Sequence, residues 1–109
     1  MHNTSSFSFF SPAIQSRVII IDARMLPHAE DWYRELNSLF QFPDYFAHNL
    51  DSLDELLHDL SWLPDSPVLC CILHFAQSLS TEPDFKKKIL HCLRTISNPR
   101  LEIHFLPTV

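Results

Sequence analysis

A short acidic stretch holds the residues whose types and spacing could do chemistry: Asp51, Asp54, Glu55 and Asp59, with His58 among them. In a helix, residues three or four positions apart lie on one face, so these side chains would gather opposite an arc of leucines. A carboxylate beside His58 could act as an acid and base pair or ligate a cation. The stretch could also be an ordinary solvated helix face. Its like charges repel by a few tenths of a kcal/mol per pair, and positions 35–85 contain no Lys or Arg to offset them.

A metal site or a hydrolase would need further groups that the sequence does not supply. Cys70 and His74 would share one strand face while Cys71 points to the other, so these three side chains do not converge. No third ligand and no nucleophile is identifiable beside His58. We therefore expect no catalytic residue, no bound metal and no cofactor.

Length, composition and charge narrow the class of protein. The chain has 109 residues, 46% of them apolar, which is typical of one globular domain. A formal net charge of -5 and a pI of about 5.7 argue against non-specific nucleic-acid binding and suit a basic partner. There is no glycine, which excludes a Walker loop, a dinucleotide fingerprint and a nucleophile elbow. Any left-handed backbone position should then fall to Asn, Asp or His, and the candidates are Asn37, His48 and Asn98.

The cysteine pattern indicates a cellular compartment. Three cysteines, two of them adjacent in an apolar run, make a poor disulfide framework and favour reduced, buried thiols. Residues 1–16 lack the basic start and apolar stretch of a signal peptide, and no run approaches the roughly 18 apolar residues of a membrane span. We expect a cytoplasmic protein, monomeric when free, with neither a membrane nor a nucleic acid as its partner.

Hydrophobic periodicity predicts the elements that position the acidic stretch. Residues 18–21 and 67–75 are continuous apolar runs, typical of strands buried on both faces of a parallel sheet. Residues 101–105 alternate apolar and polar side chains, as a half-exposed edge strand does. Amphipathic helices are expected from about 27 to 40, from an N-cap at Asn49 to near 62, and from about 81 to 98.

The order strand, helices, strand, helix, strand predicts an α/β fold with a small three-stranded parallel sheet. Residues 1–16 have no helical period and are expected to form a loose extension, with Phe7, Phe9 and Phe10 docked on the body. This divides the chain into an N-terminal extension, residues 1–16, and one domain, residues 17–109.

The segment 42–60, FPDYFAHNLDSLDELLHDL, resembles the central segment of barstar-family inhibitors. That segment carries proline, an acid, two aromatics, then Asn-Leu-Asp, Leu and an acid. The order of strands and helices agrees from Arg17 to the C-terminus, so the resemblance covers most of the chain. It implies a barstar-like α/β fold, a three-stranded parallel sheet packed with about four helices.

The resemblance also implies a function and a set of contact residues. It indicates an intracellular immunity protein that inhibits a secreted or delivered bacterial ribonuclease in a 1:1 complex, as in toxin–antitoxin pairs, by covering the basic active site with an acidic loop and helix. Tyr45 matches the loop tyrosine that packs on the nuclease, and Asp51 the first inhibitory aspartate. Glu55 stands at the position of the dominant aspartate. The partner-binding residues expected in full are Tyr45, His48, Asn49, Asp51, Asp54 and Glu55.

Three departures from the family pattern bear on which nuclease is bound. Ala47 replaces a glycine, Asp54 replaces a tryptophan, and Thr95 lies near the position of a further acid.

Two other functions stay open. One is a binding module of barstar fold whose partner is a DNase toxin or a regulatory protein. The other is a small hydrolase that uses His58 with Asp54 or Glu55.

Overall fold

The computed structural model describes residues 6–109, which form one mixed sheet and three α-helices. The strands are β1 (Ser6–Ser11), β2 (Ser16–Asp22), β3 (Val68–Leu73) and β4 (Leu101–Leu106). They lie in the order β1-β2-β3-β4, with β2, β3 and β4 parallel and β1 antiparallel to β2. The α/β class is confirmed, whereas a sheet of three strands is wrong because β1 adds a fourth.

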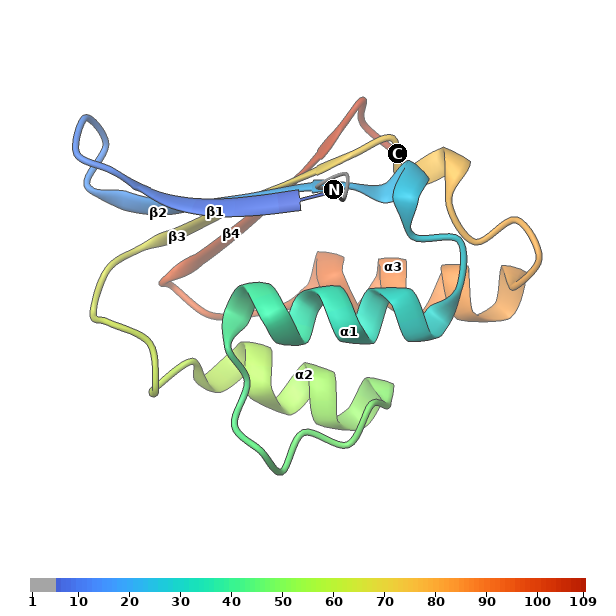
Figure 1. The fold of residues 1–109 in the computed structure, drawn as a ribbon, viewed down its shortest axis with the longest axis horizontal. Coiled ribbons are helices and arrows are strands. Elements are labelled where there is room, and N and C mark those ends of the chain that lie inside the picture. Colours follow the sequence, from blue (N-terminus) through green and yellow to red (C-terminus); the bar gives the residue numbers. More distant parts are fainter. Residues whose placement is uncertain (1–5) are drawn as a thin grey trace, which may run out of the picture.

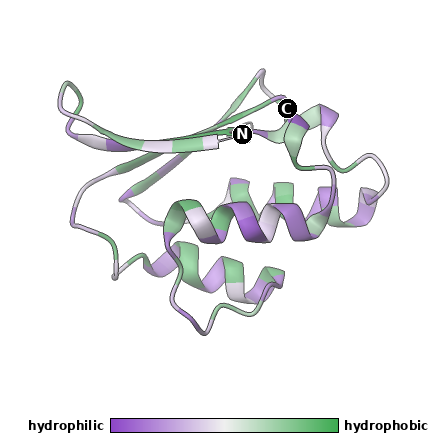
Figure 2. Cartoon of the chain, in the orientation of Figure 1, coloured by the Kyte–Doolittle hydropathy of each residue, from purple (hydrophilic) through white to green (hydrophobic). Residues whose placement is uncertain are grey.

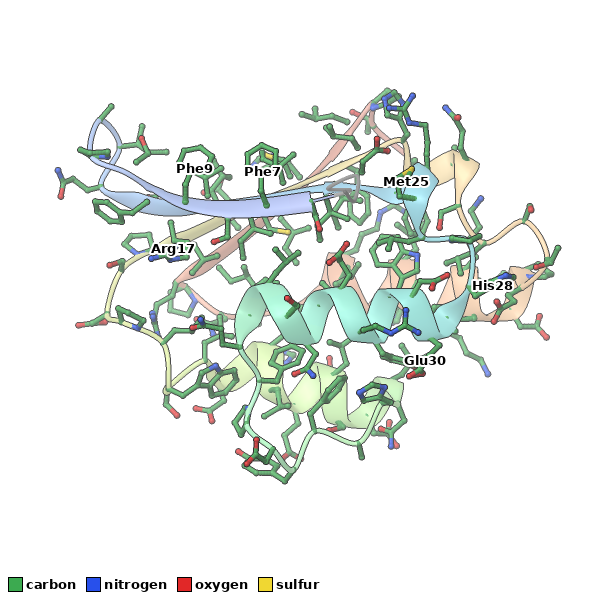
Figure 3. All side chains as sticks on the ribbon, viewed as in Figure 1. Phe7, Phe9, Arg17, Met25, His28 and Glu30 are labelled. Atoms are coloured by element: carbon green, nitrogen blue, oxygen red, sulfur yellow. The ribbon has the colours of Figure 1, made fainter. Side chains whose placement is uncertain are left out.

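Strand β1 lies in the segment expected to be a loose extension. Its sequence, SFSFFS, lacks a helical period but alternates Ser and Phe from Ser6 to Phe9, which is the period of a strand. The pairing runs from Ser6 opposite Ile21 to Ser11 opposite Ser16, so β1 and β2 form a hairpin. Phe7 and Phe9 do not dock on the body: they are 50% and 44% exposed, and both rings stand on the side of the sheet away from the helices (Figure 3).

The helices are α1 (Ala29–Phe40), α2 (Leu50–Asp59) and α3 (Pro83–Thr95), with two short 3-10 turns, η1 (Ala23–Met25) and η2 (Phe75–Gln77). All three α-helices lie on one side of the sheet, with α2 the farthest from it (Figure 1). The described chain thus has three α-helices where about four were expected. None of them is long and apolar enough to cross a membrane.

Helices on one side only mean that β2 and β3 are not buried on both faces as predicted. Ile19 and Ile21 point toward the helices and are fully buried, whereas Ile20 between them is only partly buried. The continuous apolar runs are visible along the strands in Figure 2. Strand β4 shows the predicted half-exposed alternation along its length.

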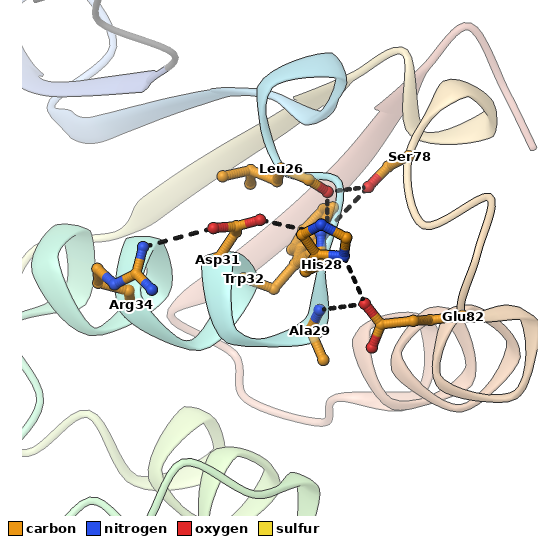
Figure 4. Close-up of polar contacts among 8 residues, drawn as sticks. All are labelled: Leu26, His28, Ala29, Asp31, Trp32, Arg34, Ser78 and Glu82. Atoms are coloured by element: carbon orange, nitrogen blue, oxygen red, sulfur yellow. Dashed lines mark hydrogen bonds and ion pairs between the residues drawn. The ribbon is translucent and has the colours of Figure 1, made fainter.

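Polar contacts fix the start of α1 against the segment that leads into α3 (Figure 4). The Glu82 carboxylate accepts a hydrogen bond from the Ala29 backbone N–H at 3.2 Å and lies 3.0 Å from Nδ1 of His28. The buried indole of Trp32 donates to the Ser78 hydroxyl at 3.0 Å. These contacts orient α1 and α3, the two helices on which α2 rests.

In the absence of glycine, other residues adopt the left-handed backbone at the ends of two helices. Gln41 ends α1 with φ 53° and Leu60 ends α2 with φ 52°. Asn37, His48 and Asn98, the positions expected from residue type, do not have positive φ. A side chain with a Cβ pays about 1–2 kcal/mol for this conformation. At Leu60 complete burial of the side chain offsets that cost.

All three cysteines are free, as predicted; Cys70 and Cys92 are buried and Cys71 is partly buried. Burial raises the pKa of the Cys70 thiol strongly and that of Cys71 less. The thiols of both residues are therefore neutral at physiological pH.

Candidate protein-binding site

The acidic helix begins at Asn49, whose side chain caps it. Asn49 Oδ1 accepts the backbone N–H of Ser52 at 2.8 Å, which confirms the predicted N-cap. The Ser52 hydroxyl accepts in turn from the backbone N–H of Ala47 at 3.2 Å. These two bonds fix the orientation of the preceding loop, residues 41–49, relative to α2.

An aromatic cluster holds the same loop from beneath. The rings of Phe42 and Phe46 are buried with centroids 4.8 Å apart, and the Trp62 ring stands edge-on to Phe42 at 5.9 Å. The Trp62 indole N–H also donates to the carbonyl of Phe40 at 2.9 Å. Tyr45 lies between Phe42 and Phe46 in the sequence, and its side chain is 67% exposed. The loop therefore presents an aromatic ring to solvent on a rigid support.

His48 joins the loop to α1. Its Nδ1 lies 2.5 Å from Oε1 of Glu30, and its ring lies 5.0 Å from that of Phe46. Glu30 was not among the predicted site residues. The two residues lie in separate segments of the chain, and no local pattern connects them.

The outer face of α2 carries carboxylates without partners. Asp51 and Glu55 are exposed on successive turns, and neither side chain has a hydrogen bond or ion pair with any other residue in 6–109. On the opposite face Leu53 and Leu57 are completely buried, as the arc of leucines predicts. The fold therefore holds these two carboxylates in place through the helix backbone alone.

Asp54 lies to the side of that pair, against α3. Its Oδ1 accepts a hydrogen bond from the Cys92 thiol at 3.7 Å and lies 3.6 Å from Nδ1 of His58, with half of the side chain exposed. Burial, reinforced by the Asp54 carboxylate, raises the pKa of the Cys92 thiol to about 12. Asp54 is therefore engaged within the molecule in a way that Asp51 and Glu55 are not.

A groove of about 300 Å³ separates α2 from α3 at this point. Leu50, Asp51 and Asp54 line its α2 side, and His91, Cys92 and Thr95 line its α3 side. The structure thus brings Thr95, one of the three departures from the family pattern, next to two predicted contact residues. His91 was missed. Its spacing of four from Thr95 on an amphipathic helix was the available signal.

Both ring nitrogens of His58 have structural partners. Nδ1 donates to the Asp54 carbonyl at 2.8 Å, and Nε2 accepts the backbone N–H of Ser97 at 3.1 Å. Beside them, the Asn98 amide donates to the Leu57 carbonyl at 3.1 Å. His58 therefore ties the end of α2 to the segment after α3 instead of facing an open cavity as a general base.

The six predicted residues therefore lie on one loop and the helix that follows it. Tyr45, Asp51 and Glu55 are free to contact a partner, while His48, Asn49 and Asp54 also bond within the chain. Among residues 6–109, no group of three His, Cys, Asp or Glu side chains could hold a metal ion. The arrangement displays negative charge on α2 and an exposed aromatic ring on the loop that leads into it, which favours recognition of a positively charged surface.

Comparison with known proteins places this arrangement in a family. No curated protein matches the chain. The family model described as Barstar (barnase inhibitor) matches residues 16–105, which include β2, β3, all three α-helices and β4 as far as Phe105, but not β1. The match covers most of the sequence, and the chain belongs to the barstar family.

Proposed function

We propose that this protein inhibits a bacterial ribonuclease by laying the loop 41–49 and helix α2 across the basic active site of the enzyme. The observation that carries the proposal is the pair Asp51 and Glu55, exposed and without partners on successive turns of α2. Like charges held one turn apart cost stability, so a basic partner supplies the reason for their placement. Members of the family are inhibitors of ribonucleases and not enzymes.

The chemistry of the site fits a nuclease. A ribonuclease binds a polyanion, and its active site therefore presents Arg, Lys or His side chains to phosphate groups. Two carboxylates on a rigid helix occupy the place of phosphates, and the exposed ring of Tyr45 supplies a flat surface as a base does. His48 and Asn49 complete the contact surface between the ring and the charges.

The remaining elements of the proposal follow from this mode of action. The complex contains one inhibitor chain per ribonuclease, because one continuous surface covers one active site. The inhibitor acts as the cytoplasmic immunity partner of a secreted or delivered toxin. The reduced state of Cys70, Cys71 and Cys92 supports the cytoplasm as its compartment.

The decisive experiment measures inhibition directly. The purified chain is titrated against barnase and against each nuclease that co-purifies with it from the native organism, and RNA cleavage is followed by fluorescence. We expect activity to fall linearly to an end point at one inhibitor per enzyme. A chain with both Asp51→Ala and Glu55→Ala is the matched control and should leave most of the activity intact.

The same assay separates the ribonuclease from the other candidate partner. Asp54 and Thr95 line the groove beside Asp51, so the departures from the family pattern lie where they would alter partner choice. A captured nuclease that cleaves DNA and not RNA, and that the chain blocks, would replace the ribonuclease by a DNase toxin. Failure to inhibit any captured nuclease would refute the proposal.

A further inference from the structure

The side of the sheet opposite the helices carries an apolar surface that the inhibitor site does not use. Side chains along each strand point alternately to the two sides of the sheet. The strand register shows which residues of the four strands share the side away from the helices. Its apolar members, which we call the open face, are Phe7, Phe9, Val18, Ile20, Leu69, Cys71, Leu73 and Leu106. No helix of residues 6–109 covers it (Figure 1).

Strand β1 enlarges this surface. Phe7 and Phe9 are 50% and 44% exposed, and their rings stack with centroids 6.0 Å apart. They lie outside residues 16–105, so β1 adds them to the part of the fold that matches the family model. A strand that only protected the edge of β2 would do so with polar side chains on its solvent side. Two phenylalanines at these positions indicate that another surface covers this face of the sheet.

The same side-chain rows also hold charged groups, and these have partners within the chain. Asp22 forms an ion pair of 2.8 Å with Arg24, and the Glu102 carboxylate accepts a hydrogen bond from His104 at 2.6 Å. The protein has a formal net charge of -5, with unpaired carboxylates on α2, on the far side of the molecule. Two open faces therefore bring together fewer unpartnered carboxylates than two α2 surfaces would.

We propose that two copies of this chain form a symmetric dimer by packing their open faces together. Four strands about 4.8 Å apart and six residues long give a footprint of roughly 400 Å². Because accessible surface exceeds a flat footprint, two such faces bury on the order of 1,000 Å², near the lower limit for a specific interface. We therefore expect a weak, reversible dimer that forms at micromolar concentrations.

This dimer replaces the monomer expected from the sequence, and it does not depend on the proposed function. Helix α2 lies on the other side of the helical layer from the sheet (Figure 1). Both inhibitory surfaces thus stay accessible, and each copy can bind one ribonuclease. Measuring the oligomeric state therefore tests the dimer, and the inhibition assay separately tests the proposed function.

Sedimentation equilibrium over protein concentrations from low to high micromolar tests the dimer. We expect the weight-average mass to approach twice that of the chain, and the combined change Phe7→Ser and Phe9→Ser to weaken association at least tenfold. Phe10→Ser is the matched control, because Phe10 is 42% exposed on the same strand but faces the other side. Tyr45→Ser controls for association through the loop 41–49.

Cys71 provides a second measurement on the unaltered chain. It is partly buried on the open face, whereas Cys70 and Cys92 are buried. Maleimide labelling of Cys71, followed by mass spectrometry, should slow several-fold as the concentration rises through the dimer range. A chain that sediments as a monomer throughout, with a labelling rate independent of concentration, would overturn the proposal. Equal loss of association in Phe10→Ser or Tyr45→Ser would overturn it too.

Discussion

The backbone N–H of Ser97 donates a hydrogen bond of 3.1 Å to Nε2 of His58. Because Nδ1 of the same ring donates to the Asp54 carbonyl, the imidazole is the neutral tautomer with its proton on Nδ1. A protonated ring would present a second donor to the Ser97 N–H. The histidine that the sequence offers as a possible general base is thus a bridge between the end of α2 and the loop after α3.

His58→Ala should lower the free energy of unfolding by about 1–2 kcal/mol, because it removes two hydrogen bonds at the end of α2. His91→Ala is the control: His91 is exposed on α3, and its ring makes no hydrogen bond within residues 6–109. Its effect should stay below about 0.5 kcal/mol. Urea unfolding followed by circular dichroism measures both. Equal stabilities of the two variants would contradict the bridging role.

Asp51→Ala and Glu55→Ala should each weaken binding to the cognate nuclease by about 2 kcal/mol or more, as central charged contacts do. Thermal stability should stay equal or rise slightly, because each change relieves repulsion along α2. Asp54→Ala should affect binding less, since Asp54 is engaged with Cys92. Stopped-flow association rates should fall steeply with added salt for the parent chain. Binding of both variants with the parent's affinity would place the inhibitory surface elsewhere.

Tyr45→Ala should also weaken binding, but through loss of ring contact. Charge is unchanged, so the affinity difference from the parent should vary little between low and high salt. The difference for Asp51→Ala should shrink as salt screens the charges. Isothermal titration at two salt concentrations compares the two variants. A strongly salt-dependent Tyr45→Ala effect would mean that the ring acts by positioning the carboxylates.

Leu53→Ala and Leu57→Ala should each cost about 2–5 kcal/mol of unfolding free energy, because both side chains are completely buried. Leu50→Ala is a milder comparison, since Leu50 is only partly buried beside the groove. Melting temperatures rank the stabilities of the three variants. If Leu50→Ala proved as damaging as Leu53→Ala, the assignment of faces on α2 would be wrong.

Alkaline pH should destabilise the fold through its buried thiols. The pKa of Cys92 is raised to about 12 and that of Cys70 is raised further, so both thiols stay neutral in the folded chain. In the unfolded chain they ionise near pH 8.5, and above that pH the unfolded state is favoured. The unfolding free energy should be unaffected by these groups at pH 7 and fall by about 1.4 kcal/mol per pH unit for each thiol.

Urea unfolding between pH 8 and pH 11 measures this slope. Cys70→Ala removes one buried thiol and should make the decline shallower, although the variant starts from a lower stability. Cys71→Ala serves as the comparison, because Cys71 is only partly buried and its pKa is raised less. An identical slope in all three chains would rule out the thiols as the cause.

The sequence alone determined the parts of this protein that depend on local patterns. The leucine spacing placed Leu53 and Leu57 inward and Asp51 and Glu55 outward, because a helix repeats every 3.6 residues. Asn49 marked the start of α2, because its side chain can accept a backbone N–H of the first turn. The segment 42–60 and the order of elements indicated the barstar family, and the family model confirms it.

Tertiary structure decided the features that depend on contacts between distant segments, which local sequence patterns do not predict. An apolar run does not record whether one face of its strand or both are covered, and here Ile20 stays on an open face while Ile19 is buried. Residues 6–11 become a strand because β2 offers an unpaired edge for their backbone groups. The distinction between Asp54 and the free carboxylates of α2 depends on α3, which is far away in the sequence. It arises only when the fold brings Cys92 to Asp54, because a contact between distant segments depends on the packing of whole elements.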